Sequence, residues 1–296
     1  MVVMNESFSD LTAYLEGYET STDPMPYVRS LMKRGDVVSG TCAVSSDMGT
    51  GTANSEFKFL TGNSMAYFKG NTPYVQFIDT ETPSLASLLA GHSTMAMHAY
   101  ERAGYNRVKV YDRFGFEVYK GIEDFDVDLD YARGYPTDEA NYRQLISYFE
   151  TVDEPTVVLF FGDHEPRLSN EFYSNWFTDE NDLDLETTTQ LHKTPFFIWG
   201  NYNLNTESIQ KGSVVSLNYL STVLFQTAGV QLSPYQEYLA DLRMEHPVIT
   251  ARYSTTAFGD KVGTAPSAFT DSIHEYQWLQ YNCVFDRAHR IPGFYS

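Results

Sequence analysis

The apolar run at residues 157–161 constrains the fold of this chain more than any other feature. It reads Val-Val-Leu-Phe-Phe and lies between Pro155 and Gly162. Five consecutive apolar residues with such boundaries are typical of a strand that is buried on both faces of a sheet. Asp163 and His164 follow this strand directly. They are therefore expected at the carboxyl edge of the sheet, where α/β proteins bind their ligands.

Shorter apolar runs alternate with segments of helical periodicity along the rest of the chain, which predicts an α/β fold with a βαβ-type sheet. Further strands are predicted at residues 2–4, 37–44, 94–97, 116–119 and 195–199. Helices are predicted at residues 26–33, 53–60, 82–91, 106–114, 137–150, 217–228 and 234–244. We assign residues 1–245 to a main catalytic domain. Residues 246–296, which are aromatic and irregular in pattern, are predicted to form a smaller extension packed on it.

The charge of the chain argues against one class of partner. The 296 residues carry a formal net charge of −19, and a surface this acidic repels the phosphate backbone of nucleic acids. An anionic lipid substrate would need a cation inside the site. The two cysteines, Cys42 and Cys283, are too few for a cysteine-based metal site. They are compatible with one disulfide or with two free thiols.

The start of the chain suggests that it is part of a longer protein. No signal peptide is visible, nor any apolar run of about 18 residues that could span a bilayer. The chain opens on Met1-Val2-Val3-Met4, which is the pattern of a core strand. We therefore expect an upstream region that this sequence does not contain.

Four side chains at or beside strand ends could form a site. Glu6 follows the first strand, Asp163 and His164 follow the strand at 157–161, and Thr52 lies in a Gly-rich loop where a helix starts. Two carboxylates, one imidazole and one hydroxyl suit Mn²⁺ or Mg²⁺, and the histidine also permits Zn²⁺. A bound divalent cation would stabilise the alkoxide of Thr52, which makes this hydroxyl a candidate nucleophile.

Each of these residues also has a purely structural interpretation. Thr52 could be only the N-cap of the adjoining helix, and Glu6 could be a solvated turn residue. His98 could be a half-buried histidine of the core, and Arg107 could lie on a solvated helix face. The four aspartates of residues 124–130 read as a solvated loop, since their spacing is not that of a calcium site.

Read together, these segments resemble the lipoteichoic acid synthases and related phosphoglycerol transferases of the sulfatase and alkaline phosphatase superfamily. Residues 4–11 (Met-Asn-Glu-Ser-Phe-Ser-Asp-Leu) resemble the first metal-binding segment of that family. Residues 51–57 (Gly-Thr-Ala-Asn-Ser-Glu-Phe) resemble its nucleophile segment. Residues 161–166 (Phe-Gly-Asp-His-Glu-Pro) resemble its second metal segment. His98 with Asn106-Arg107 resembles the segment that binds glycerophosphate, and all four segments occur in the family's order.

The resemblance implies an alkaline phosphatase/sulfatase-like sheet flanked by helices and a role for each residue. Glu6, Thr52, Asp163 and His164 would hold one Mn²⁺ or Mg²⁺ ion, and Thr52 would form a glycerophosphoryl-threonine intermediate. His98 and Arg107 would bind the phosphate or glycerol head of the substrate. The implied donor is phosphatidylglycerol, and the acceptor is a polyglycerophosphate chain or a glycan. The implied location is the extracytoplasmic face of a bacterial cell membrane, with membrane attachment through the absent N-terminal region.

The sequence departs from the family pattern at two places. Tyr105 stands where relatives carry tryptophan before Asn106-Arg107. Between residues 135 and 142, relatives carry several tens of further residues, with a core strand and an Asn-His-Gly segment that have no counterpart here. Loss of a strand from the middle of a parallel sheet would leave backbone groups unpaired on its neighbours, so these must close up, admit water or leave an exposed edge. We therefore expect marginal stability, and retained metal-site geometry with poor transferase activity.

Two alternatives to a phosphoglycerol transferase arise from these departures. One is another enzyme of the superfamily, such as a different phosphodiesterase or phosphotransferase. A sulfatase is disfavoured because the sequence contains no Cys/Ser-x-Pro-x-Arg motif for its nucleophile. The other alternative is an inactive, ligand-binding paralogue that lacks the internal segment.

Overall fold

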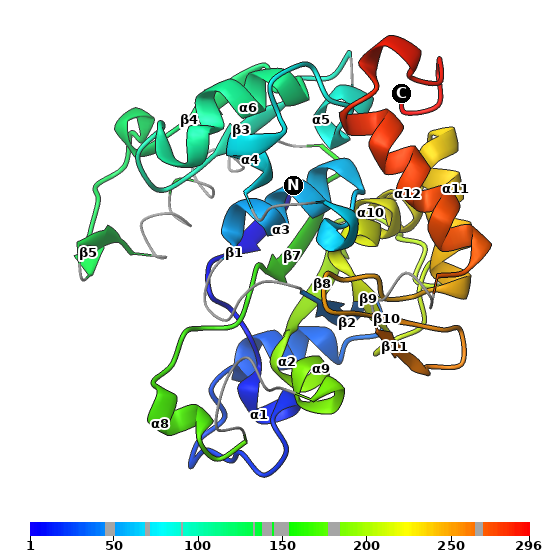
Figure 1. Cartoon of the computed structure of the whole chain (residues 1–296). Coiled ribbons are helices and arrows are strands. Elements are labelled where there is room, and N and C mark those ends of the chain that lie inside the picture. The colour runs from blue at the N-terminus through cyan, green and yellow to red at the C-terminus, as the bar shows by residue number, and fades with distance from the viewer. Residues whose placement is uncertain are drawn as a thin grey trace.

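The chain folds around a central sheet of five strands in the order β1-β7-β8-β2-β9 (Figure 1). This computed structural model describes residues 1–44, 51–68, 72–89, 91–132, 134–137, 144, 154–176, 184–263 and 269–296. The strands are β1 (Val2–Asn5), β7 (Val157–Gly162), β8 (Lys193–Gly200), β2 (Val38–Ala43) and β9 (Val214–Ser216). The predicted strands at 2–4, 37–44, 157–161 and 195–199 are therefore confirmed.

Strand directions in this sheet are mixed. β1 pairs parallel to β7, and β2 pairs parallel to β9. β8 runs antiparallel to both of its neighbours, β7 and β2. The expectation of a purely parallel sheet is therefore wrong, because β8 enters the sheet from the edge at which β7 ends.

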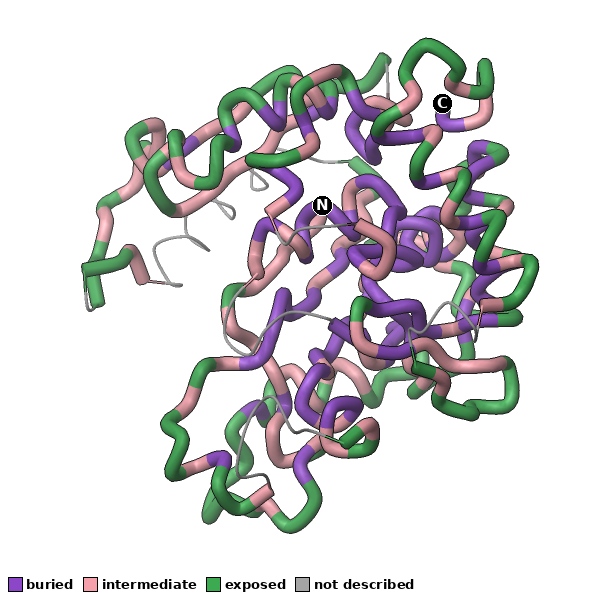
Figure 2. The backbone as a smooth tube through the Cα atoms, in the orientation of Figure 1, coloured by how far each residue is buried: buried purple, intermediate pink, exposed green. Residues whose placement is uncertain are grey.

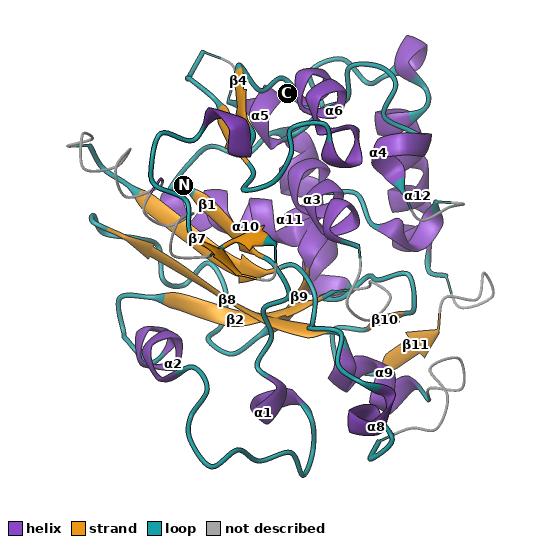
Figure 3. Cartoon of the chain, turned by 90° about the vertical axis from the view of Figure 1, so that its left-hand side faces the viewer, coloured by secondary structure: helices purple, strands orange, loops and turns teal. Residues whose placement is uncertain are grey.

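Helices cover both faces of the sheet, which confirms the predicted α/β architecture (Figure 3). One face carries α3 (Thr52–Thr61), α10 (Leu220–Ala228) and α11 (Pro234–Glu245), and the other carries α1 (Leu11–Tyr14), α2 (Pro26–Met32) and α9 (Leu185–Leu191). The remaining α-helices are α4 (Pro73–Gln76), α5 (Leu85–Leu88), α6 (Arg107–Phe114), α8 (Asn170–Tyr173) and α12 (Asp271–Val284).

The main apolar core lies between the sheet and the helices of its first face. Leu159 and Phe161 of β7 and Phe196 and Ile198 of β8 are fully buried there against α10. Figure 2 shows this region as a continuous buried zone. This packing anchors the carboxyl end of β7 on the face of the sheet that α10 covers.

A second apolar cluster joins α3 and α11 to the C-terminal residues. Phe57 of α3 and Tyr276 of α12 are fully buried in it, and Leu239 of α11 is almost fully buried. The sequence predicted no helix beyond residue 245, and the 14-residue helix α12 corrects that prediction. Its pattern was obscured because aromatic residues occupy both its buried and its exposed positions. The division of the chain at residue 245 stays a prediction.

Residues 91–136 pack beside the sheet, and α6 (Arg107–Phe114) contributes Val110, Tyr111 and Phe114 to the second apolar cluster. β3 (Met95–Met97) pairs parallel with β4 (Val118–Lys120), and α6 forms the crossover between them. A short hairpin comes next, made of β5 (Tyr131–Ala132) and β6 (Tyr135–Pro136). The predicted strands at 94–97 and 116–119 therefore exist, the second shifted by about one residue, but they do not join the central sheet.

The sheet has no internal gap among its described strands. β7, β8 and β2 each have a partner on both sides, whereas β1 has a described partner only at β7. Of the outcomes predicted for a missing strand, this arrangement fits closure of its neighbours, with β1 left at an edge of the described sheet. The helix predicted at 137–150 lies outside the described residues, apart from Thr137 and Gln144.

Two further expectations can be compared with the fold. Cys42 and Cys283 are both buried free thiols, so the alternative of a disulfide between them is wrong. Among the described residues, no helix is long and apolar enough to cross a lipid bilayer.

Candidate active site

The register between β1 and β7 brings two of the predicted site residues together. Asn5 lies opposite Gly162, so Glu6 and Asp163 leave the sheet side by side at the carboxyl ends of parallel strands. A Cβ atom at Gly162 would lie 1.8 Å from the backbone oxygen of Phe8, so only glycine fits there. The hydroxyl of Thr194 donates to the Gly162 carbonyl at 2.8 Å and fixes the strand end from the other side.

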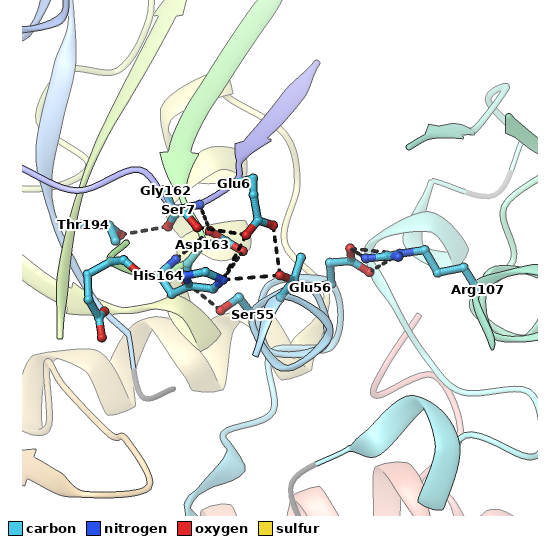
Figure 4. Close-up of polar contacts among 11 residues, drawn as sticks. Glu6, Ser7, Ser55, Glu56, Arg107, Gly162, Asp163, His164 and Thr194 are labelled. Atoms are coloured by element: carbon cyan, nitrogen blue, oxygen red, sulfur yellow. Dashed lines mark hydrogen bonds and ion pairs between the residues drawn. The ribbon is translucent and has the colours of Figure 1, made fainter. Parts of the chain in front are cut away.

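Helix α3 brings Thr52 to the same point. Gly51, with φ of 99°, is the N-cap, and Thr52 is the first helical residue. The interpretation of Thr52 as an N-cap is therefore wrong, and its hydroxyl is free for other contacts. Thr52 Oγ1 lies 3.1 Å from Glu6 Oε2 and 3.4 Å from His164 Nε2. One turn further on, Ser55 Oγ donates to the Asp163 carbonyl at 2.7 Å and docks the helix on the strand end (Figure 4).

The ligand atoms of Glu6, Asp163 and His164 converge. His164 Nε2 lies 3.3 Å from Glu6 Oε1 and 3.2 Å from Asp163 Oδ2. The other ring nitrogen, Nδ1, lies 2.9 Å from the Glu165 carbonyl, which can only accept a hydrogen bond. Nδ1 therefore carries the proton in the neutral ring, and the Nε2 lone pair faces the carboxylates. The structure thus brings together all four residues predicted as metal ligands.

The hydrogen bonds of Asp163 test whether a cation fits this arrangement. Its Oδ1 accepts two backbone N–H groups, from Ser7 and from His164, each at 2.8 Å. Its Oδ2 is buried and has no hydrogen-bond partner among the described residues. A buried carboxylate oxygen without a donor is costly unless something positive meets it. Because this oxygen faces His164 Nε2 and Glu6, a divalent cation fits the set.

The pKa values of the three groups also show that the cluster favours positive charge. The hydrogen bond to His164 lowers the pKa of Glu6 to about 2, although burial opposes the shift. Burial raises the pKa of Asp163 to about 7. Burial lowers the pKa of His164, but the hydrogen bond to Glu6 and the charge of Asp163 outweigh it and raise the value to about 9. Without a cation, a proton on His164 therefore balances the carboxylates.

We expect metal binding to displace that proton. Below about pH 9 His164 is protonated, and a cation needs its free Nε2 lone pair. Mn²⁺ affinity should therefore rise about tenfold per pH unit between about pH 7.5 and 8.5, and more steeply below about pH 7, where Asp163 must also lose its proton. Calorimetric titration in two buffers of different ionisation enthalpy measures the affinity and the release of protons. His164→Ala should weaken Mn²⁺ binding and lessen its pH dependence, whereas the exposed His274→Ala should keep the affinity and the pH dependence of the parent. An affinity that is independent of pH would contradict His164 as a ligand.

His98 and Arg107 also lie together, but in an environment that the sequence did not predict. Arg107 is fully buried, so its interpretation as a solvated helix residue is wrong. Its Nη2 lies 2.6 Å from Glu56 Oε1 and its Nη1 lies 3.5 Å from His98 Nδ1. Burial and the charge of Arg107 lower the pKa of His98 to about 4, so His98 is neutral at physiological pH. His98 can therefore act as a hydrogen-bonding group without adding charge.

Glu56 is a functional candidate that sequence reasoning missed. It lies on α3 four residues after Thr52, and it accepts hydrogen bonds from Arg107 and from the hydroxyl of Tyr111, the latter at 2.9 Å. Figure 4 shows Glu56 between the cluster at Glu6 and Arg107. The four-residue spacing from Thr52 was the available signal, because residues four apart share one face of a helix.

Backbone strain marks the segment before Arg107. Tyr105 and Asn106 adopt left-handed backbone conformations with φ of 54° and 61°. The Tyr105 ring lies under the guanidinium, with Arg107 Cζ 5.1 Å from the ring centroid. Asn106 Nδ2 donates to the Tyr74 carbonyl at 3.2 Å and holds the turn. Such strain, on the order of 1–2 kcal/mol per residue, persists only where the surrounding structure enforces it.

A comparison of the sequence with models of known protein families identifies the family of this chain. The model described as "Sulfatase" matches residues 1–148 and 137–230, which together cover more than half of the chain. This chain belongs to the sulfatase family. The two matched stretches meet and overlap at residues 137–148, next to the place where the resemblance predicts additional residues in relatives. The sulfatase fold and the converging carboxylates and imidazole also agree with the divalent metal that the superfamily typically uses.

Solved structures share the sulfatase-like fold over nearly the whole chain. The phosphoglycerol transferase GacH from Streptococcus pyogenes, solved with sn-glycerol-1-phosphate, matches 96% of this chain and 85% of its own chain, with a TM-score of 0.73 and 16% identity. The lipoteichoic acid synthase LtaP from Listeria monocytogenes matches 95% and 90%, with a TM-score of 0.59 and 15% identity. An alkaline phosphatase superfamily protein from Vibrio parahaemolyticus matches 100% and 87%, with a TM-score of 0.59 and 11% identity.

One curated relative is similar along the full chain. It is a "Putative cyclic beta-1,2-glucan modification protein" from Rhizobium meliloti, 24% identical over 369 residues, against the 296 residues of this sulfatase-family chain. The match covers 100% of this chain but only 56% of the relative, so the chain spans about half the length of that protein. Family and fold together support an enzyme of the transferase or hydrolase type.

Proposed function

We propose that this chain is a metal-dependent phosphoglycerol transferase domain. It would move glycerophosphate from phosphatidylglycerol to a polyglycerophosphate or glycan acceptor. The observation that carries the proposal is the convergence of Thr52 Oγ1 with Glu6, His164 and Asp163, whose Oδ2 accepts no hydrogen bond from the described residues. A hydroxyl has little reactivity at neutral pH without such an environment. The fold shared with GacH and LtaP supports the same chemistry.

The metal would be held by Glu6, Asp163, His164 and Thr52, with Mn²⁺ or Mg²⁺ best suited to this oxygen-rich set. When bound, such a cation favours the alkoxide form of a neighbouring hydroxyl and offsets charge on a phosphoryl oxygen. The four proposed ligands include a single histidine, and this disfavours softer ions. The backbone N–H groups at the start of the ten-residue helix α3 favour the phosphate at the same place.

Transfer would proceed in two displacements. Thr52 Oγ forms a bond to the phosphorus of phosphatidylglycerol while the bond from phosphorus to the diacylglycerol oxygen breaks, and diacylglycerol leaves with a proton. An acceptor hydroxyl then forms its bond to phosphorus while the Thr52 Oγ–P bond breaks. The acceptor hydroxyl loses its proton in this step, and Thr52 Oγ takes up one proton as it leaves phosphorus. His98 would orient the glycerophosphate during both steps, and the fully buried Arg107, whose Nη1 lies 3.5 Å from His98 Nδ1, would hold the ring of His98 and supply positive charge behind it.

The location and the acceptor belong to the proposal as well. A donor of this kind lies in a membrane, so we place the domain at the extracytoplasmic face of the bacterial cell membrane, attached through a region outside this sequence. The name of the Rhizobium meliloti relative, a glucan modification protein, supports a glycan among the acceptors.

Release of diacylglycerol from phosphatidylglycerol vesicles tests the proposal. We expect release with Mn²⁺, its loss after chelation with EDTA, and its return when Mn²⁺ or Mg²⁺ is added back, because Thr52 is a poor nucleophile without the cation. Turnover of another phosphodiester but not of phosphatidylglycerol would favour a different enzyme of the superfamily. Metal-independent lipid or glycan binding without turnover would favour the inactive paralogue.

A further inference from the structure

Three exposed tyrosines extend outward from the residues proposed to hold the glycerophosphate. Tyr100, Tyr105 and Tyr135 have exposed fractions of 41%, 51% and 60%. We call them the tyrosine rim. Large aromatic side chains usually contribute to cores, so several on one exposed surface indicate a binding surface.

Ring contacts connect the rim to the candidate site without interruption. The rings of Tyr135 and Tyr100 lie 5.7 Å apart with an interplanar angle of 34°, and Tyr100 meets His98 edge-on at 6.2 Å. Arg107 Nη1 lies 3.5 Å from His98 Nδ1, and the ring of Tyr105 lies against the same guanidinium. The rim therefore begins where the glycerophosphate site ends, which is where an acceptor must approach.

The chemistry of the rim fits a sugar. Within the described part of the chain, no hydrogen bond involves the hydroxyl groups of the three rim tyrosines, so all three remain available to a ligand. A tyrosine offers a rigid apolar face with a polar tip, at a low cost in side-chain entropy. Sugar rings have an apolar face and a border of hydroxyl groups, which is the complementary surface.

The local charge favours a neutral acceptor over a negatively charged phosphate polymer. Residues 121–136, which end in the hairpin of Tyr135, carry five acidic side chains and one basic side chain. A polyglycerophosphate chain carries one negative charge per unit and would be repelled at this border. A neutral glycan would not be repelled.

From these contacts we infer that the tyrosine rim is the acceptor subsite and that the acceptor is a neutral glycan. The inference rests on the proposed transferase function. The ring of the sugar would stack on the rim, and one of its hydroxyl groups would form the new bond to phosphorus as the Thr52 Oγ–P bond breaks.

The hairpin provides a matched control. Tyr131 is also 60% exposed, but the register pairs Ala132 with Tyr135, so Tyr131 and Tyr135 lie on opposite faces of the hairpin. The experiment titrates a neutral β-glucan oligosaccharide into the Mn²⁺-loaded protein. Tyr135→Ala should weaken its binding about tenfold, Tyr135→Phe, which keeps the ring and loses the hydroxyl, should weaken it less, and Tyr131→Ala should stay close to the parent. Polyglycerophosphate of matched length should bind at least about tenfold more weakly than the glucan.

The outcomes separate this inference from the proposed function. Absence of glucan binding by the parent, equal losses in Tyr131→Ala and Tyr135→Ala, or equal affinity for polyglycerophosphate would each overturn the acceptor assignment. Diacylglycerol release to water, measured without any acceptor, tests the transferase chemistry alone. If that release is absent but glucan binding is weakened by Tyr135→Ala and not by Tyr131→Ala, the proposed transferase function is wrong. The assignment of the tyrosine rim as a glycan-binding surface is then still supported.

Discussion

Replacement of Thr52 by alanine is expected to reduce diacylglycerol release by a factor of about a thousand or more. The hydroxyl is the atom proposed to attack phosphorus, and it lies 3.1 Å from Glu6 and 3.4 Å from His164. Thr52→Ser keeps a hydroxyl at the same place and should retain a measurable rate. Release of diacylglycerol from phosphatidylglycerol in the presence of Mn²⁺ is the assay.

The same substitution should leave the fold intact, which makes the test specific. Gly51 caps α3, so the alanine variant loses no cap, and its free energy of unfolding should change by less than about 0.5 kcal/mol. Chemical denaturation of the parent and the variant measures this. An alanine variant that retains the parent rate would show that another group is the nucleophile.

Replacement of Glu56 by alanine should have the largest effect on stability. Glu56 is the anionic partner of Arg107, a side chain with no solvent exposure, and it also accepts from the Tyr111 hydroxyl. Burial lowers the pKa of the Arg107 guanidinium, but the charge of Glu56 outweighs burial and raises it. Arg107 therefore stays charged, and leaving it unpaired should lower the free energy of unfolding by about 3–5 kcal/mol.

An exposed ion pair provides the comparison for Glu56. Asp124 lies 3.1 Å from Arg102, and both side chains are about one-third exposed or more. Asp124→Ala should therefore cost no more than about 1 kcal/mol in urea denaturation. An equal loss in the free energy of unfolding for Glu56→Ala and Asp124→Ala would mean that the ion pair of Glu56 and Arg107 is not isolated from water.

The sequence was sufficient to locate the strand ends that carry the candidate ligands. The run at 157–161 followed by Asp163-His164, and the first strand followed by Glu6, are local patterns, so each could be recognised without knowing its neighbours. Their convergence additionally required β1 and β7 to be adjacent and parallel, which the family resemblance implied and the register shows. Whether they hold a metal remains a prediction.

The features that the sequence did not reveal depend on distant parts of the chain. The direction of β8 is set by the strands on each side of it, and an apolar run has the same pattern in either direction. Glu56 and Arg107 look like ordinary helical surface residues, because their burial arises only when α3 packs beside α6. The aromatic composition of residues 271–284 likewise concealed α12.

Helix α3 links the two halves of the site through its rotational register. Thr52, Ser55 and Glu56 lie within five consecutive positions, and they contact Glu6, the Asp163 carbonyl and Arg107 respectively. At 3.6 residues per turn, one inserted or deleted residue within that stretch rotates the remainder of the helix by about 100°. Such a change would turn Glu56 away from Arg107, or Thr52 away from Glu6, in one step. We therefore expect this chain to tolerate a length change in the loops around α3 better than one between Thr52 and Glu56.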